Sequence, residues 1–167
     1  AKRWVTEGNN VTIFSGNDGH SKRSETIDGV SIIRRGGVYT VYVWAFLYYM
    51  FSLRKTVDIV IDSENGIPFF TPLYVRKPII LLIHHIHQDV FRKYLRFPLS
   101  TVAGFLESIC MPLVYNSNTI VTVSESSKKE ILRLLPEKED DINIVHPGIN
   151  NGFIPSPKTL YPSFTYL

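Results

Sequence analysis

The stretch Pro78-Ile-Ile-Leu-Leu-Ile-His-His-Ile-His-Gln-Asp89 decides how this chain folds. It opens with an uncharged apolar run over residues 79–83, which is too short for a membrane span and suits a strand buried on both faces of a sheet. Directly after the run come His84, His85 and His87, three of the five histidines of the chain. Open α/β sheets build ligand sites where buried strands end in polar groups, so a site is predicted here.

Short apolar strands alternate with helical segments along most of the chain, which is typical of an α/β fold with a doubly wound, mostly parallel sheet. The predicted strands cover residues 57–62, 79–83, 119–123 and 142–145, and the main predicted helices cover residues 99–115 and 124–135. Right-handed crossovers place the carboxyl ends of parallel strands at one edge. The residues expected to line a crevice there are Asn65, Gly66, His84, His85 and Ser124.

The region before residue 54 is less regular. Short strands are predicted over residues 11–15 and 30–34, with a polar loop over 16–27 and a turn at Asp28-Gly29. Residues 36–53 carry no charge and are rich in aromatic side chains. A transmembrane helix would need about 20 apolar residues with aromatics at its ends, which this segment does not offer. It is therefore predicted to form a buried helix, with a membrane-surface face as the alternative.

Composition narrows the class of protein. The chain of 167 residues has a net charge of +3, and its basic residues come as scattered pairs rather than as one patch, which argues against nucleic-acid binding. Cys110 is the only cysteine, so no internal disulfide can form, which fits a reducing compartment. The chain is long enough for one domain with a core of its own.

The candidate chemistry centres on His84, the first polar residue after the central strand. A neutral imidazole there can donate or accept a hydrogen bond near neutral pH, or bond a loop carbonyl as a structural group. Strand alternation predicts that His84 and His85 point to opposite sides, so that only one faces the crevice. With His87 they also suggest a metal site, but zinc ligands are usually well separated in sequence, and no metal ligand is assigned here.

Two other groups have both a functional and a structural interpretation. Asp62, Glu64 and Asn65 could supply a general base or bind sugar hydroxyls, or they could form a polar turn. Ser124 could offer its hydroxyl and the following helix amides to an anion, or act as a helix N-cap. A capping box at Ser127-x-x-Glu130 competes with Ser124 for that position. The glycine-rich dinucleotide, Walker and hydrolase signatures are absent from this sequence.

Four segments stand out by their order and spacing: Asp62-Ser-Glu-Asn-Gly-Ile-Pro-Phe-Phe-Thr-Pro-Leu-Tyr74, Pro78-Ile-Ile-Leu-Leu-Ile-His-His-Ile-His87, Val121-Thr-Val-Ser-Glu-Ser-Ser127 and Val145-His-Pro-Gly-Ile-Asn150. Together they resemble the family 4, or "group 1", retaining glycosyltransferases of GT-B fold. The resemblance covers nearly the whole chain. It implies two facing Rossmann-like domains, of which residues 1–149 would be a partial N-terminal, acceptor-side domain. Residues 150–167 would be the linker and the start of the C-terminal donor domain.

The resemblance also implies roles for particular residues. His84 takes the position of a histidine that orients the donor sugar and stabilises charge by a hydrogen bond. Asn65, Gly66, His85 and Ser124 take substrate-facing positions, and Gly148 lies where the family has its hinge. The partners implied are a nucleotide-sugar donor and a glycan, lipid-linked or small-molecule acceptor. No metal or other cofactor is expected, because protein cations and helix N-termini would balance the phosphate charge.

Parts of the family pattern are missing from this sequence. They are the first strand with its glycine-rich loop and the E-x-x-x-x-x-x-x-E segment of the donor domain, so the isolated chain is expected to be inactive. Two other functions remain open, a non-catalytic module that binds a glycan or lipid-linked acceptor and a metal-dependent hydrolase. A cytoplasmic location is expected, with peripheral contact at the inner face of the membrane as a further expectation.

Overall fold

A parallel sheet forms the centre of the molecule. The computed structural model describes residues 1–148, with the side chains of all of these except 88, 89 and 136–138. Its main sheet has the order β4-β5-β6-β7, and every neighbouring pair is parallel. The strands are β4 (Val60–Glu64), β5 (Ile79–Ile83), β6 (Thr119–Thr122) and β7 (Ile142–Ile144). The predicted parallel α/β sheet is therefore confirmed. The four strands follow chain order, so the described sheet contains no reversal of order.

The core lies between this sheet and the helices that cover it. On β5 the side chains of Ile79, Leu81 and Ile83 are buried, while the alternate residues are only half-buried. The prediction that this strand is buried on both faces thus holds fully for one face only. Facing β5 are the fully buried Met111 and Tyr115, and the cluster continues through β6 and the following helix. At roughly 2 kcal/mol for each fully buried large side chain, this cluster supplies most of the hydrophobic stabilisation of the domain.

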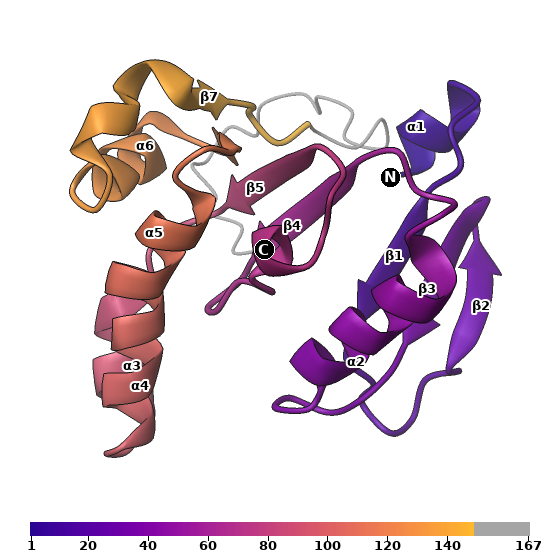
Figure 1. The fold of residues 1–167 in the computed structure, drawn as a ribbon, viewed down its shortest axis with the longest axis horizontal. Helices are drawn as coiled ribbons and strands as arrows, with labels where there is room; N and C mark the ends of the chain where they lie inside the picture. Colours follow the sequence, from indigo (N-terminus) through magenta and orange to yellow (C-terminus); the bar gives the residue numbers. More distant parts are fainter. Residues whose placement is uncertain (149–167) are drawn as a thin grey trace, which may run out of the picture.

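A long helical column connects β5 to β6 (Figure 1). It consists of α4 (Leu99–Phe105), a π-helical turn η3 (Leu106–Cys110) and α5 (Met111–Tyr115), and α3 (Gln88–Tyr94), which follows β5, packs beside α4. The sequence predicts a break near Pro112, and the break takes the form of η3. A proline ring collides with the carbonyl four residues earlier, and the wider π turn relieves that collision without interrupting the column.

The first strands form a sheet of their own, apart from the main one (Figure 1). Its order is β1-β3-β2, with β1 (Thr12–Ser15) parallel to β3 (Val30–Arg34) and β2 (Ser24–Ile27) antiparallel to it. The prediction of a loop over residues 16–27 is wrong for β2. This polar strand pairs through a hairpin at Asp28-Gly29, where both residues have positive φ, 52° and 79°. Such a turn fits the twist of a two-residue hairpin, and burial is not needed to define the strand.

The aromatic segment is helical, as predicted, but it is not buried. Helix α1 (Lys2–Thr6) precedes β1, and α2 (Val41–Tyr48) runs beside the β1–β3 sheet into the π-helical turn η1 (Tyr49–Leu53) (Figure 1). Val41 and Tyr49 are the buried residues of α2 and η1. The exposed ones include Tyr39, Val43, Trp44, Phe46 and Phe51, with Phe51 85% exposed. Within the described chain, no helix is long and apolar enough to cross a membrane.

Helix α6 (Glu125–Leu132) follows β6 after two residues, and Ser124 is the residue directly before its first turn. The Ser124 side chain accepts a hydrogen bond of 3.2 Å from the Ser127 amide. Ser124 is thus the N-cap, and the capping box starting at Ser127 is wrong. After α6, a 3₁₀ turn η4 (Pro136–Asp141) leads to β7; another, η2 (Thr71–Leu73), lies between β4 and β5. The predicted linker, residues 150–167, lies outside the described residues.

Candidate functional site

The carboxyl ends of three neighbouring strands border one open hollow of about 510 Å³. Its lining residues are Ser63 and Asn65 from the end of β4, His84 and His85 from the end of β5, and Val123 after β6. Because all four strands are parallel, segments far apart in sequence meet at this edge. The structure therefore brings Asn65, His84 and His85 together, as the sequence predicts.

His84 and His85 both lie at this hollow, which differs from the alternation expected of a strand. Strand β5 ends at Ile83, so the two histidines stand in a loop where the two-residue period no longer applies. Both side chains are exposed. The ring of His85 also contacts His87, with 4.0 Å between the ring centroids. Two imidazoles can therefore reach one ligand from the same strand end.

The other predicted residues lie near the hollow but do not line it. Gly66 is buried with φ at 117°, a conformation that suits glycine, and its amide is used within the protein. Ser124 follows Val123, but its hydroxyl caps α6. Gly148 is the last described residue, and a Cβ added there would lie 3.5 Å from the Arg3 guanidinium. The roles assigned to these three residues stay predictions.

Asp62 belongs to the interior and not to the hollow. Its carboxylate is 2% exposed and accepts hydrogen bonds from the Phe69 amide at 3.1 Å and the Thr71 hydroxyl at 2.8 Å. The Thr71 amide and the Tyr115 hydroxyl also donate to it. Burial, followed by the charge of Asp62, raises the pKa of Tyr115 above its usual range. Asp62 thus fixes the loop after β4, and it is shielded from any ligand in the hollow.

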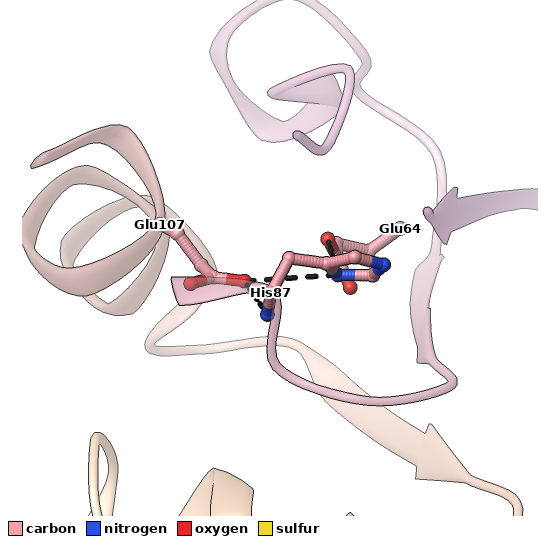
Figure 2. A group of neighbouring side chains, drawn as sticks. All are labelled: Glu64, His87 and Glu107. Atoms are coloured by element: carbon pink, nitrogen blue, oxygen red, sulfur yellow. Dashed lines mark hydrogen bonds and ion pairs between the residues drawn. The ribbon is translucent and has the colours of Figure 1, made fainter. Parts of the chain in front are cut away.

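A second group of side chains lies inside the protein next to the hollow. Glu64 alternates with Ser63 and Asn65 at the end of β4 and is fully buried, as is Glu107 from η3. Between them lies the ring of His87, 7% exposed, whose Nδ1 is 3.4 Å from Glu64 Oε1 and 3.8 Å from Glu107 Oε1 (Figure 2). We refer to Glu64, His87 and Glu107 as the buried triad.

Backbone amides hold one oxygen of each carboxylate in the buried triad. The Gly66 amide donates to Glu64 Oε1 at 2.7 Å, and the His87 amide donates to Glu107 Oε1 at 2.5 Å. Burial raises the pKa of Glu64 to about 8, helped by the charges of Glu107 and Asp62 and opposed by the Gly66 amide. Burial also raises the pKa of Glu107 to about 7. The pKa of His87 is lowered by burial and by His85.

Sequence reasoning assigned no role to two residues near the hollow, Glu107 and His146. Glu107 lies in a long apolar helix, and the only signal was a single acid in that helix without a basic residue one turn away. His146 follows β7, and its Nδ1 is 3.2 Å from the carbonyl oxygen of Val123, so a fourth strand end approaches the hollow. Among the described residues, the side chains that lie close enough together to act as metal ligands are those of Glu64, His87 and Glu107, and not the three adjacent histidines.

The residues that line the hollow suit a ligand rich in hydroxyl groups. Two imidazoles, an amide and a serine hydroxyl can each donate and accept hydrogen bonds. None of the five lining residues is a carboxylate, so the described part of the hollow lacks the pair of carboxylates that glycoside hydrolases place across the scissile bond. The hollow can orient a polar ligand and stabilise charge, which is the chemistry of a transfer site that relies on positioning.

Comparison with known proteins agrees with this geometry. The family model described as Glycosyltransferase Family 4 matches residues 1–152. No curated protein matches the chain. The match includes the parallel sheet, the hollow at its edge and the four segments noted in the sequence. A glycosyltransferase has, in general terms, a sugar donor and an acceptor as partners. Because the match covers most of its length, the chain belongs to glycosyltransferase family 4.

Proposed function

We propose that this chain is the acceptor-side half of a glycosyltransferase that moves a hexosyl group from a nucleotide-sugar donor with retention of configuration. The observation that carries the proposal is the hollow, where polar side chains from separate strand ends converge within a glycosyltransferase family 4 domain. The acceptor would be a glycan, a lipid-linked saccharide or a small molecule. The nucleotide diphosphate would bind mainly to a second domain facing this edge.

In this proposal His84 is the residue closest to the chemistry. Its exposed imidazole would donate a hydrogen bond to the donor sugar, orient it and stabilise the charge that develops as the glycosidic bond to the diphosphate breaks. Asn65 and His85, which share the hollow, would bind sugar or acceptor hydroxyls. Gly66, Ser124 and the α6 amides would shape the same edge, and Gly148 would lie near the hinge. No metal is assigned to the transfer step.

The test is to replace His84 by alanine in the full-length protein and to measure release of nucleoside diphosphate across a panel of sugar nucleotides. Loss of one well-placed donor to a charged transition state typically costs 10²-fold or more in kcat. We expect that loss for His84→Ala, with a smaller change in KM. His20→Ala removes an exposed histidine far from the hollow and should keep full activity. Near-normal turnover of His84→Ala would remove His84 from the mechanism.

Retention needs a separate measurement. Proton NMR of the first product formed should show the same anomeric configuration as the donor sugar. An inverted anomer would contradict this part of the proposal without affecting the family assignment.

A lipid-linked acceptor is favoured by the exposed face of α2 and η1. Trp44 and Phe51 are exposed on these two elements, Tyr39 is exposed just before α2, and the exposed Arg54 and Lys55 follow η1 directly. Aromatic side chains beside basic ones suit the boundary of an anionic bilayer, so we propose a cytoplasmic protein with peripheral contact at the inner face of the membrane. A non-catalytic module that only binds such an acceptor is the second candidate. Sugar transfer by the full-length protein would exclude it.

A further inference from the structure

The buried triad contains polar atoms that the protein itself leaves without partners. Among the described residues, the buried side-chain nitrogen and oxygen atoms lacking a hydrogen bond are Glu64 Oε2, His87 Nδ1 and Glu107 Oε2. All three belong to one cluster, and each comes from a different element. Unpartnered buried polar atoms are rare in proteins, and each usually costs 1–3 kcal/mol. Three of them at one place make this cluster a candidate binding site.

The geometry of the triad suits a metal ion. One ligand atom from each residue can be chosen such that all lie within 4.8 Å of one another. The separations of 3.4 Å and 3.8 Å from His87 Nδ1 are too long or poorly directed for hydrogen bonds. Both distances end on the Oε1 atoms, and they place the two carboxylate groups near the ligand-to-ligand spacing of roughly 3.3 Å that a tetrahedral ion with bonds of about 2.0–2.1 Å requires. Figure 2 shows the His87 ring between the two carboxylate groups.

The surroundings of each ligand are already ordered as in a metal site. The amide of Gly66 holds one oxygen of Glu64, and the amide of His87 holds one oxygen of Glu107. The second oxygen of each carboxylate is left free. Hydrogen bonds of this kind orient carboxylate ligands and are a regular part of metal sites.

The net charge of the buried triad favours a metal ion over an ion pair in which both glutamates are ionised. Glu64 and Glu107 are fully buried, and within the described chain their ion pairs are with His87 alone. With both carboxylates ionised, an imidazolium would still leave a net negative charge in the interior, which is costly, so without a metal ion the carboxylates have to bind protons. A divalent cation with two carboxylates and a neutral imidazole sums to zero. A mixed nitrogen and oxygen set suits Zn²⁺, whereas Ca²⁺ and Mg²⁺ prefer oxygen ligands alone.

We propose that Glu64, His87 and Glu107 bind one Zn²⁺ ion that ties the end of β4, the loop after β5 and the η3 turn together. The fourth ligand would be water. The ion would hold the segments that carry Asn65, His84 and His85, and no step of sugar transfer is assigned to it. The inference stands on the buried triad and does not depend on the proposed function.

The experiment uses the full-length protein without a histidine tag, freed of metal by a chelator and then dialysed against Zn²⁺. Metal content by mass spectrometry should be one equivalent higher for the wild type than for Glu107→Gln or Glu64→Gln. Glutamine keeps the size of the side chain and an oxygen for the backbone amide. The matched control Glu7→Gln, at an exposed position, and His84→Ala should keep the wild-type metal content.

Two further measurements on the wild type keep the proposal testable if a glutamine variant fails to fold. Zn²⁺ should raise the melting temperature of the metal-free protein, whereas Mg²⁺ at the same concentration should not. Co²⁺ in place of Zn²⁺ should give the intense visible absorption of a four-coordinate ion. A wild-type protein that takes up no Zn²⁺, or glutamine variants that retain the full metal content, would overturn the proposal.

Discussion

Phe70 has a backbone φ of 52°, a left-handed conformation that is strained for a bulky residue. The amides on both sides of it, those of Phe69 and Thr71, donate to the Asp62 carboxylate. The ring of Phe70 packs 6.3 Å from the ring of Tyr115, whose hydroxyl also donates to Asp62. One buried carboxylate therefore holds the strained turn that shapes the loop behind the hollow.

Replacing Asp62 by asparagine should lower the free energy of unfolding by about 2–4 kcal/mol. An amide can accept with one oxygen only, and its NH₂ group would face amide donors that need acceptors. Urea denaturation measures the change. Asp58→Asn, at an exposed position, is the matched control and should lie within about 0.5 kcal/mol of the wild type. Equal midpoints for the two variants would contradict the role of Asp62.

At the scale of elements, the junction between β6 and α6 holds the end of β5 in place. The Thr122 hydroxyl donates to the Ile83 carbonyl at 2.8 Å, and the Ser127 hydroxyl donates to the His84 carbonyl at 2.6 Å. The first bond joins the last residues of β6 and β5, and the second holds the residue directly after β5. The position of His84 thus depends on a helix that follows it by some forty residues in the sequence.

Ser127→Ala should remove this support for His84. We expect a loss of about 1 kcal/mol or more in unfolding free energy, because the partly buried hydroxyl donates to the His84 carbonyl and also lies 3.0 Å from the Ser124 hydroxyl. We also expect a several-fold lower kcat, because the backbone of His84 loses its anchor. Ser126→Ala, one residue earlier and exposed, is the control for both measurements. Unchanged kcat in Ser127→Ala would show that this anchor does not position His84.

The same scale shows which elements the sequence could predict. The apolar run at 79–83 coincides with β5, because a short uncharged run bounded by polar residues leaves few alternatives. Strand β2, with the sequence Ser-Glu-Thr-Ile, has no such signal, since hairpin pairing rather than burial defines it. The uncharged segment containing α2 was predicted to be buried, although its aromatics are largely exposed. Lack of charge predicts apolar surroundings, but it cannot say whether protein or another surface provides them.

At the scale of the whole molecule, the parallel sheet explains why the site was partly predictable. Parallel strands have a common carboxyl edge, so Asn65, His84 and His85 could be placed together from the strand positions alone. The buried triad could not, because Glu107 reaches it from η3, inside the long column. Contacts of that kind depend on how a helix rotates and packs, which a single sequence does not specify.

The triad should also give the metal-free protein a characteristic pH dependence. The pKa of Glu64 is raised to about 8 from an ordinary value of 4.5. At pH values between these two, the folded state therefore binds more protons than the unfolded state. Stability must then fall as the pH rises toward 8. The lowered pKa of His87 acts in the opposite sense, and its effect fades as the pH rises past the ordinary value of 6.5, because the imidazole then becomes neutral in both states.

Urea unfolding between pH 6.5 and 8.5 in the presence of a chelator measures this dependence. The wild type should lose more stability over this range than Glu64→Gln, by about 1 kcal/mol or more, since one pKa unit corresponds to about 1.4 kcal/mol. Glu7→Gln should follow the wild type. Parallel curves for the wild type and Glu64→Gln would show that Glu64 does not carry a raised pKa.

Burial alternates along the end of β4: Asp62 and Glu64 are buried, whereas Ser63 and Asn65 are exposed at the hollow. Ligand preference can therefore diversify at positions 63 and 65 while positions 62 and 64 keep the interior intact. Selection, or a mutant library, could explore the two outward positions freely. Inserting a single residue between Ser63 and Glu64 would be more damaging than a substitution at either outward position, because it would turn the Glu64 carboxylate toward solvent and the Asn65 amide toward the core.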